Sequence, residues 1–252
     1  MESTIAEDKA APKFSKASKM PCLSWSLPAV ETCPGSTIFS DKYNGKLENW
    51  NTHYENFVKD SERVPSCQGC YATTGNYLYK NVKAVREHNV VDWQKPDWVS
   101  KMVSTIKHER YFRFFDSGDI YCVELAEKIK EVCRRCPDTK FWIPTLAWKI
   151  PAIMEALETI AELENVTVRC SQGSVMPGNA IDLEVFGYNQ FSIVVENPET
   201  VASKKGIVVC SAYNRDGKCG QCRACWSKRV EYILYPAHGV VMKSKIKKNF
   251  EV

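Results

Sequence analysis

Short apolar strands alternate with amphipathic helices through the middle of the chain, and this order restricts the possible folds most strongly. Apolar residues at helical spacing predict helices over 98–106, 123–133 and 153–163. Short apolar runs predict strands between and after these helices, at 111–115, 141–143, 166–170, 191–195 and 207–210. Alternation of this kind is typical of parallel βαβ units, so we expect an α/β fold with a parallel sheet.

Polar residues follow several of the predicted strands directly. They lie at 116–119 (DSGD), 144–149, 171–174 and Ser211. In parallel α/β folds ligands bind beyond the carboxyl ends of the strands, so these segments are expected to share one functional face. The 116–119 segment has two interpretations, a ligand-binding turn and a simple N-cap for the helix that follows it. Arg113 and Lys149 are candidate cations for an anionic ligand, or else surface charges.

The N-terminal part of the chain is less regular. Residues 1–20 are polar and are expected to form a disordered tail. Alternating apolar residues at 23–27 predict a strand, which leads Cys33 into a Pro-Gly turn. Residues 38–66 have no clear period and are interpreted as an insertion, with a short helix near 50–58, and a helix is expected over 73–91. The expected divisions of the chain are 21–200, a cysteine-rich segment at 201–240, and a basic tail at 241–252.

The stretch from Cys210 to Trp226 carries four cysteines, of which the last three have the spacing C-x2-C-x2-C. Thiolates at this spacing can converge from one tight loop onto a small inorganic centre. A fourth cysteine at a distance is the iron–sulfur pattern, whereas zinc sites more often pair two C-x2-C turns across a longer gap. We therefore expect an iron–sulfur cluster, with zinc as the alternative and buried thiols or disulfides as the third interpretation. The candidate ligands are Cys210, Cys219, Cys222 and Cys225.

The remaining cysteines divide into candidate ligands and core residues. Cys67 and Cys70 form a C-x2-C pair, and Cys33 can supply a third ligand to it. Cys22 is undecided and could complete that first site. The others fit an interpretation as helix-end or core thiols, namely Cys122, Cys133, Cys136 and Cys170.

The sequence shows no targeting signal, so we expect a cytoplasmic protein. It has 12 cysteines, no apolar run long enough to span a membrane, and an N-terminus without the pattern of a signal peptide. Cysteines of a cytoplasmic protein indicate metal binding more than disulfides. The net charge of +4 is mild. Nucleic-acid binding is a weaker alternative, which rests on basic residues at the tail and beside the cysteine motif: Lys243, Lys245, Lys247, Lys248, Arg223, Lys228 and Arg229. His238 is one further candidate metal ligand.

Four motifs in a fixed order carry a family resemblance. They are Cys33 with Pro34-Gly35, CQGCYA at 67–72, RFFDSGD at 113–119 and CGQCRACW at 219–226. The chain resembles the phage gene product 88 family from about Leu27 to His238. The resemblance implies a phage-encoded protein of the host cytoplasm.

That family in turn looks like a diverged relative of radical S-adenosylmethionine enzymes. The likeness implies a partial (β/α) barrel, a 4Fe–4S cluster on three cysteines, and bound S-adenosylmethionine. Cys33, Cys67 and Cys70 match the three cysteines, although their first gap is much longer than the family's three residues and Tyr71 follows rather than precedes the last cysteine. Ser117, Gly118 and Asp119 match the turn that holds the amino group of S-adenosylmethionine. The C-terminal cysteines match an auxiliary cluster.

These observations predict an iron–sulfur protein with a radical-enzyme-like fold, whose substrate no motif identifies. A non-catalytic redox or structural iron–sulfur protein is the second hypothesis, and the long gap between Cys33 and Cys67 favours it. A zinc-stapled nucleic-acid-binding protein is the third.

Overall fold

A computed structural model of the chain describes residues 11–17, 19–36, 64–68, 70–176, 190–196, 198 and 206–237. All structural statements below concern these residues. The expected helix near 50–58, His238 and the basic tail from 241 onward lie outside them. Within the described part, no helix combines the length and the hydropathy that are needed to cross a membrane.

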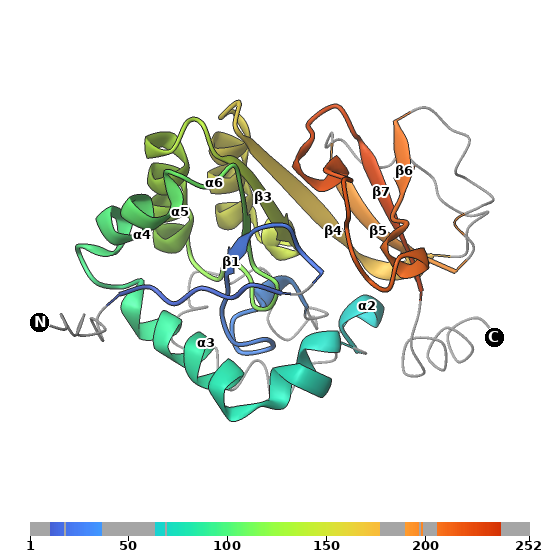
Figure 1. Cartoon of the computed structure of the whole chain (residues 1–252), viewed down its shortest axis with the longest axis horizontal. Coiled ribbons are helices and arrows are strands. Elements are labelled where there is room, and N and C mark those ends of the chain that lie inside the picture. Colours follow the sequence, from blue (N-terminus) through green and yellow to red (C-terminus); the bar gives the residue numbers. More distant parts are fainter. Residues whose placement is uncertain are drawn as a thin grey trace, which may run out of the picture.

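Seven parallel strands form one sheet, which is not closed (Figure 1). Its order is β1-β2-β3-β4-β5-β7-β6, so strands that follow one another in the chain are neighbours from β1 to β5. Stepwise order in one direction is the winding of a (β/α) barrel rather than of a doubly wound sheet. The strands are β1 Leu23–Trp25, β2 Tyr111–Phe114, β3 Lys140–Thr145, β4 Val166–Met176, β5 Phe191–Val195, β6 Ile207–Val209 and β7 Tyr232–Pro236. The predicted α/β class and the parallel sheet are confirmed.

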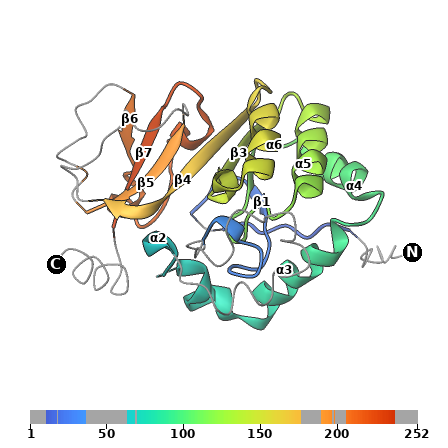
Figure 2. The same ribbon diagram turned by 180° about the vertical axis from the view of Figure 1, so that it is seen from behind.

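Three helices cover one face of β1–β4: α4 (Trp98–Ile106), α5 (Val123–Arg135) and α6 (Pro151–Ala161) (Figures 1 and 2). Each presents an apolar stripe to the sheet, as the sequence period predicts. Proline begins α6, where its missing N–H costs nothing. The side-chain amide of Asn165 donates to the carbonyls of Cys133 and Cys136 and so closes the C-terminal end of α5.

The strand alternation sends different residues to the two faces of the sheet. Phe112 and Phe114 of β2 join the core beneath the helices, whereas Tyr111 and Arg113 point to the opposite face. A second, smaller cluster on that opposite face contains Trp142 of β3 together with Trp226. The loop between β6 and β7 therefore covers the face of the sheet that the helices leave open.

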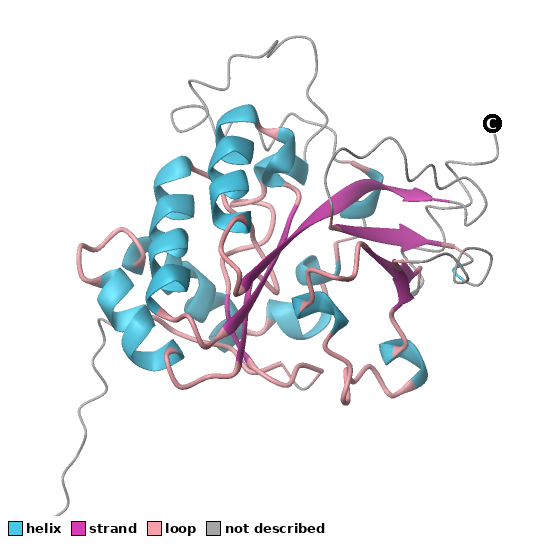
Figure 3. Cartoon of the chain, turned by 90° about the horizontal axis from the view of Figure 1, so that it is seen from above, coloured by secondary structure: helices cyan, strands magenta, loops and turns pink. Residues whose placement is uncertain are grey.

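Two further helices lie along the edge where the strands end. They are α2 (Pro65–Gln68) and α3 (Lys80–Asp92), seen below the strands in Figure 1. Figure 3 shows the molecule from above, with helices packed along one side of the strands. The Asn89 side chain donates to the carbonyl of Ser26, just beyond β1, at 3.0 Å. Beyond the carboxyl ends of the strands, this edge therefore carries α3 and the turns that precede it.

Three segments of the described part differ in detail from the sequence-based expectations. Within the segment expected to be a tail, Phe14 packs on the main core, and Ser15 pairs with Ser24 as an isolated bridge. The expected helix over 73–91 is two 3-10 turns, Tyr71–Thr73 and Gly75–Leu78, followed by α3. The C-terminal cysteine-rich segment contributes β6 and β7 to the common sheet, so the sheet continues across the boundary expected near 200.

Candidate functional site

The first cysteine group consists of Cys33, Cys67 and Cys70. Cys33 precedes a 3-10 turn at Pro34–Ser36, and the other two lie in and just after α2. The backbone N–H of Val64 donates to the carbonyl of Ser36 at 2.9 Å. This bond joins the two ends of the intervening segment, so a long gap in sequence becomes a short one in space.

The three thiols interact electrostatically with one another and with charged neighbours. The pKa of Cys33 is raised well above its ordinary value, chiefly by burial and then by Asp119, with smaller contributions from Cys67 and Cys70. Burial lowers the pKa of Lys149, which is partly opposed by the nearby Cys67 thiol. The structure therefore brings together the three cysteines that the sequence assigned to one site, and places a cation beside them.

The backbone around the first cysteine group is tightly constrained. Val30 and Phe115 both have positive φ, 77° and 60°, which is rare for a β-branched and for a bulky residue. A Cβ built on Gly35 would lie 1.9 Å from the carbonyl oxygen of Leu146. Only glycine lets the turn after Cys33 approach the end of β3 this closely. Strained positions of this kind concentrate at functional sites.

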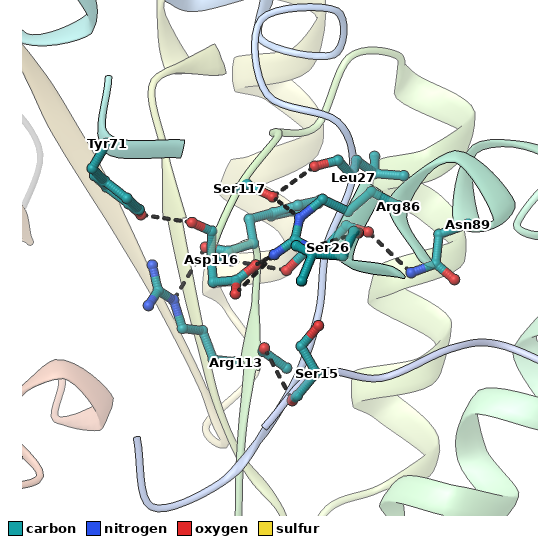
Figure 4. A network of polar contacts seen from close by, with 12 residues as sticks. Ser15, Ser26, Leu27, Tyr71, Arg86, Asn89, Arg113, Asp116 and Ser117 are labelled. Atoms are coloured by element: carbon teal, nitrogen blue, oxygen red, sulfur yellow. Dashed lines mark hydrogen bonds and ion pairs between the residues drawn. The ribbon is translucent and has the colours of Figure 1, made fainter. Parts of the chain in front are cut away.

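The 116–119 turn after β2 is held by an internal polar network (Figure 4). The Arg86 guanidinium of α3 forms a buried, forked ion pair with Asp116, with N–O distances of 3.1 and 3.2 Å. Arg86 also donates to the Ser117 hydroxyl, which donates in turn to the carbonyl of Leu27 at 2.8 Å. The Tyr71 hydroxyl, from the residue after Cys70, donates to the carbonyl of Asp116 at 2.6 Å. The network thus connects the cysteine turn, α3 and the end of β2.

The residues predicted to bind S-adenosylmethionine make contacts within the protein. Asp119 accepts from the backbone N–H groups of Ile120 and Leu146, each at 2.7 Å. Burial nonetheless raises its pKa to about 6. A Cβ on Gly118 would clash with Leu27 and Thr32 at 2.6 Å, so this glycine serves close packing of the chain on itself. In this arrangement the 117–119 turn links the ends of β1, β2 and β3.

The second cysteine group consists of Cys210, Cys219, Cys222 and Cys225 on the loop between β6 and β7. Burial raises the pKa of Cys219, and the thiols of Cys210 and Cys222 raise it further. Burial also raises the pKa of Cys225, to about 11, with a smaller contribution from Cys210. The four thiols that the sequence assigned to one centre are therefore electrostatic neighbours.

Arg169 of β4 anchors this loop to the sheet. Its guanidinium, which is fully buried, donates to five backbone carbonyls of the loop at 2.8–3.5 Å, those of Ala224, Cys225, Ser227, Val230 and Glu231. Trp226 adds a second attachment, because its indole N–H donates to the carbonyl of Phe112 at 2.9 Å and its ring packs edge-on against Trp142. The last cysteines of the motif are thus fixed against the face of the sheet that the helices leave open, which we call the inner face.

Cys22 lies with the second group rather than the first. Burial raises its pKa to about 12, with Arg113 opposing and the Cys219 thiol contributing. The backbone N–H of Cys219 donates to the carbonyl of Lys19 at 3.0 Å, and its thiol lies 3.8 Å from the Met20 sulfur. The chain segment before β1 therefore packs against the C-terminal cysteine loop.

No group of three or more His, Cys, Asp or Glu side chains within the described ranges has an arrangement that could hold a metal ion as it stands. In both cysteine groups the thiols lie near one another without converging. Metal sites are commonly organised by the metal itself, which binds thiolates and draws them together. The chemistry open to both groups is soft-metal coordination, since thiolate ligands favour zinc and iron–sulfur clusters.

The remaining cysteines and one of the basic residues take part in the packing of the fold. Cys133, Cys136 and Cys170 are buried in the cores, as expected for them. Among the basic residues, Lys228 donates to the carbonyls of Ala161 and Leu163 at the end of α6.

Sequence reasoning missed two residues of the site. The role of Arg169 was not predicted, although a single arginine within the apolar run 166–170 is the signal of a buried anchor. Tyr235 of β7 was not considered, and its hydroxyl lies 3.5 Å from the Cys225 sulfur. The whole of β7 was missed, although the run YILYP has the composition of a strand that ends at proline.

The sequence was compared with family models, curated proteins and solved structures. The family model described as Gene product 88 matches residues 2–228, which include both cysteine groups. No curated protein and no solved structure matches the chain. The match spans most of the 252 residues, so the chain belongs to the gene product 88 family of bacteriophage proteins.

Proposed function

We propose that this protein binds an iron–sulfur cluster through Cys210, Cys219, Cys222 and Cys225. The observation that carries the proposal is the gathering of these four thiols on a loop that Arg169 fixes to the sheet. The C-x2-C-x2-C spacing favours an iron–sulfur cluster over zinc. Trp226, which is 6% exposed, shields one side of the loop from water.

Two guanidiniums beside the second cysteine group support a negatively charged centre there. Within the described residues, neither Arg113 nor Arg169 has a carboxylate within the 4.0 Å of an ion pair. Both interact electrostatically with Cys225. Arg113 is half-buried and has Asp116 as an electrostatic neighbour, whereas Arg169 is fully buried and is bonded to neutral carbonyl groups only. A buried cation is stabilised by a nearby negative charge. A metal centre with four thiolates carries net negative charge and would compensate these arginines, whereas four neutral thiols would not.

A second candidate function concerns the first cysteine group. The Ser36–Val64 closure brings Cys33, Cys67 and Cys70 to the carboxyl edge of a stepwise parallel sheet, where a cluster with one open iron could bind S-adenosylmethionine. Such a cluster supplies an electron for reductive cleavage of that cofactor. In this proposal the three cysteines hold the cluster, and Lys149 provides a cation for an anionic group of the ligand. The 117–119 turn would act through its backbone, since its side chains are bonded within the protein.

Metal analysis of anaerobically purified full-length protein tests both proposals. Iron, acid-labile sulfide and zinc are measured for the wild type, Cys222→Ala, Cys67→Ala and the matched control Cys122→Ala. We expect iron and sulfide in the wild type and the control. Cys222→Ala should lose the iron and sulfide of the second cysteine group, and Cys67→Ala those of the first. An unchanged Cys67→Ala protein would remove the second candidate only. Zinc without sulfide, even after anaerobic reconstitution, would refute the cluster and leave the zinc-stapled protein.

A further inference from the structure

Arg113 of β2 lies between the two cysteine groups, on the inner face of the sheet. Its guanidinium stacks on the ring of Trp142 at 4.4 Å, and its Nε–H donates to the carbonyl of Phe115 at 3.1 Å. These two contacts fix the side chain along the face that the cysteine loop covers. The strand alternation that points Phe112 and Phe114 into the helical core is the reason that Arg113 faces this way.

On one side, Arg113 contacts the first cysteine group through Tyr71. The Tyr71 hydroxyl donates to the carbonyl of Asp116 (Figure 4). It also interacts with the Arg113 guanidinium. Tyr71 follows Cys70 directly in the chain and interacts electrostatically with its thiol. Any change that moves the Cys67–Tyr71 turn therefore moves a partner of Arg113.

On the other side, Arg113 lies near the second cysteine group, because the Trp142 ring on which it stacks packs against Trp226, the residue after Cys225. Its charge acts on the thiols of Cys219 and Cys225, and on Cys22 beside them. It also interacts with Tyr235, whose hydroxyl lies 3.5 Å from the Cys225 sulfur. Arg113 therefore interacts electrostatically with Tyr71, which follows Cys70, and with Tyr235, which lies beside Cys225.

We propose that Arg113 is a positioning residue that couples the two cysteine groups electrostatically, so that the state of the first group changes the redox and metal-binding properties of the second. The inference rests on the proposed metal centre. A positive charge near a thiolate-bound cluster favours its reduced, more negative form and favours thiolate over thiol. When the first group binds a metal, Tyr71 is held in place. Tyr71 then holds the Arg113 guanidinium at a fixed distance from the thiolates of the second group.

The alternative is that Arg113 has a structural role only, and this alternative predicts different effects of its substitution. The Phe115 and Trp142 contacts would hold the end of β2 whether or not a cluster is present. Their loss would lower the free energy of unfolding without changing the properties of a cluster that still binds. The reduction potential is therefore the readout that separates the two roles.

The test compares full-length protein, purified anaerobically, as wild type, Arg113→Gln, Arg113→Lys and Tyr71→Phe. Arg134→Gln is the control, because Arg134 is an exposed arginine paired with Glu131 on α5. After iron and sulfide are shown to be retained, the reduction potential of the C-terminal cluster is measured with Cys67→Ala added to each background. We expect a lower potential in Arg113→Gln, recovery in Arg113→Lys, a smaller shift of the same sign in Tyr71→Phe and none in Arg134→Gln.

Coupling requires one further result. Cys67→Ala should shift the potential of the C-terminal cluster when Arg113 is present, and the shift should disappear in Arg113→Gln. As a readout that any bound metal gives, the pH at which half the metal is lost on acidification should rise in Arg113→Gln, since the thiolates lose a stabilising cation. Equal potentials and equal release midpoints in wild type and Arg113→Gln would overturn the inference. Absence of metal from the wild type would instead refute the proposed function.

Discussion

Asp119 shows how a single residue in this chain can be placed correctly and assigned the wrong contacts. The sequence predicted its position after β2, because an acidic residue follows an apolar strand and a glycine. It did not predict that two backbone amides, those of Ile120 and Leu146, would take both carboxylate oxygens. The second amide comes from the end of the neighbouring strand, and only the tertiary fold brings it within reach. The carboxyl group is thus an internal link between strand ends.

We predict a pH-dependent effect of Asp119→Asn on stability. Burial raises the pKa of Asp119 from 3.8 to about 6 in the fold, so the folded chain binds this proton more tightly than the unfolded chain does. The contribution to the free energy of unfolding is full below pH 4 and is lost as the pH rises to 6. The stability of the wild type relative to Asp119→Asn should fall by up to about 3 kcal/mol over this range. Urea unfolding of the metal-free proteins measures the two free energies of unfolding. A stability advantage of the wild type that grows with pH would contradict a raised pKa of Asp119.

Gly35 gives a second prediction at this scale. Gly35→Ala places a Cβ on the carbonyl oxygen of Leu146, a backbone atom that no rotamer change can move away. The expected loss in the free energy of unfolding is more than about 3 kcal/mol, beyond ordinary overpacking. The control is Gly75→Ala, where the Cβ meets open space and only the positive φ of 58° is unfavourable, at about 1–2 kcal/mol. Chemical denaturation of both variants compares them, and equal losses would show that the turn after Cys33 can move.

Among the elements, the loop between β6 and β7 depends most on one partner. Its cysteine motif was evident from sequence, and its docking surface was not. Docking depends on Arg169, a charged residue within an apolar strand, and on carbonyl groups that no residue type marks in advance. β7 was missed for a related reason. It pairs with β5 and β6, and the strand–helix alternation that predicted the earlier strands does not extend to it.

Arg169→Gln should release the loop and weaken the C-terminal metal centre. The variant leaves several buried carbonyls without a donor, at about 1–3 kcal/mol for each unpaired group, so a loss of at least about 3 kcal/mol is expected. Arg134→Gln breaks an ion pair that is exposed to solvent, so its stability should stay close to that of the wild type. Limited proteolysis and metal content report on the loop. A variant with wild-type metal content and no new cleavage between 206 and 231 would show that Trp226 alone is a sufficient anchor.

At the scale of the whole molecule, the fold brings the segment before β1 against the loop between β6 and β7. Residues 19–22 pack on the C-terminal cysteine loop, and the Ser36–Val64 bond closes the first cysteine group at the edge of the same sheet. Periodicity predicted the fold class, the helices α4, α5 and α6 and most of the strands, because those features are local. It could not place Cys22 in the second group or Arg113 between the groups, because both positions depend on strand register and on which face each strand presents.

The measurement that tests the central claim most directly is the Mössbauer spectrum of full-length protein that has been reconstituted anaerobically with iron-57 and sulfide. The account predicts the quadrupole doublets of a thiolate-bound iron–sulfur cluster, with the C-terminal cluster's signal lost in Cys219→Ala and retained in Cys122→Ala. A spectrum that shows only unclustered iron, in a protein that instead retains zinc on the same cysteines, would contradict it.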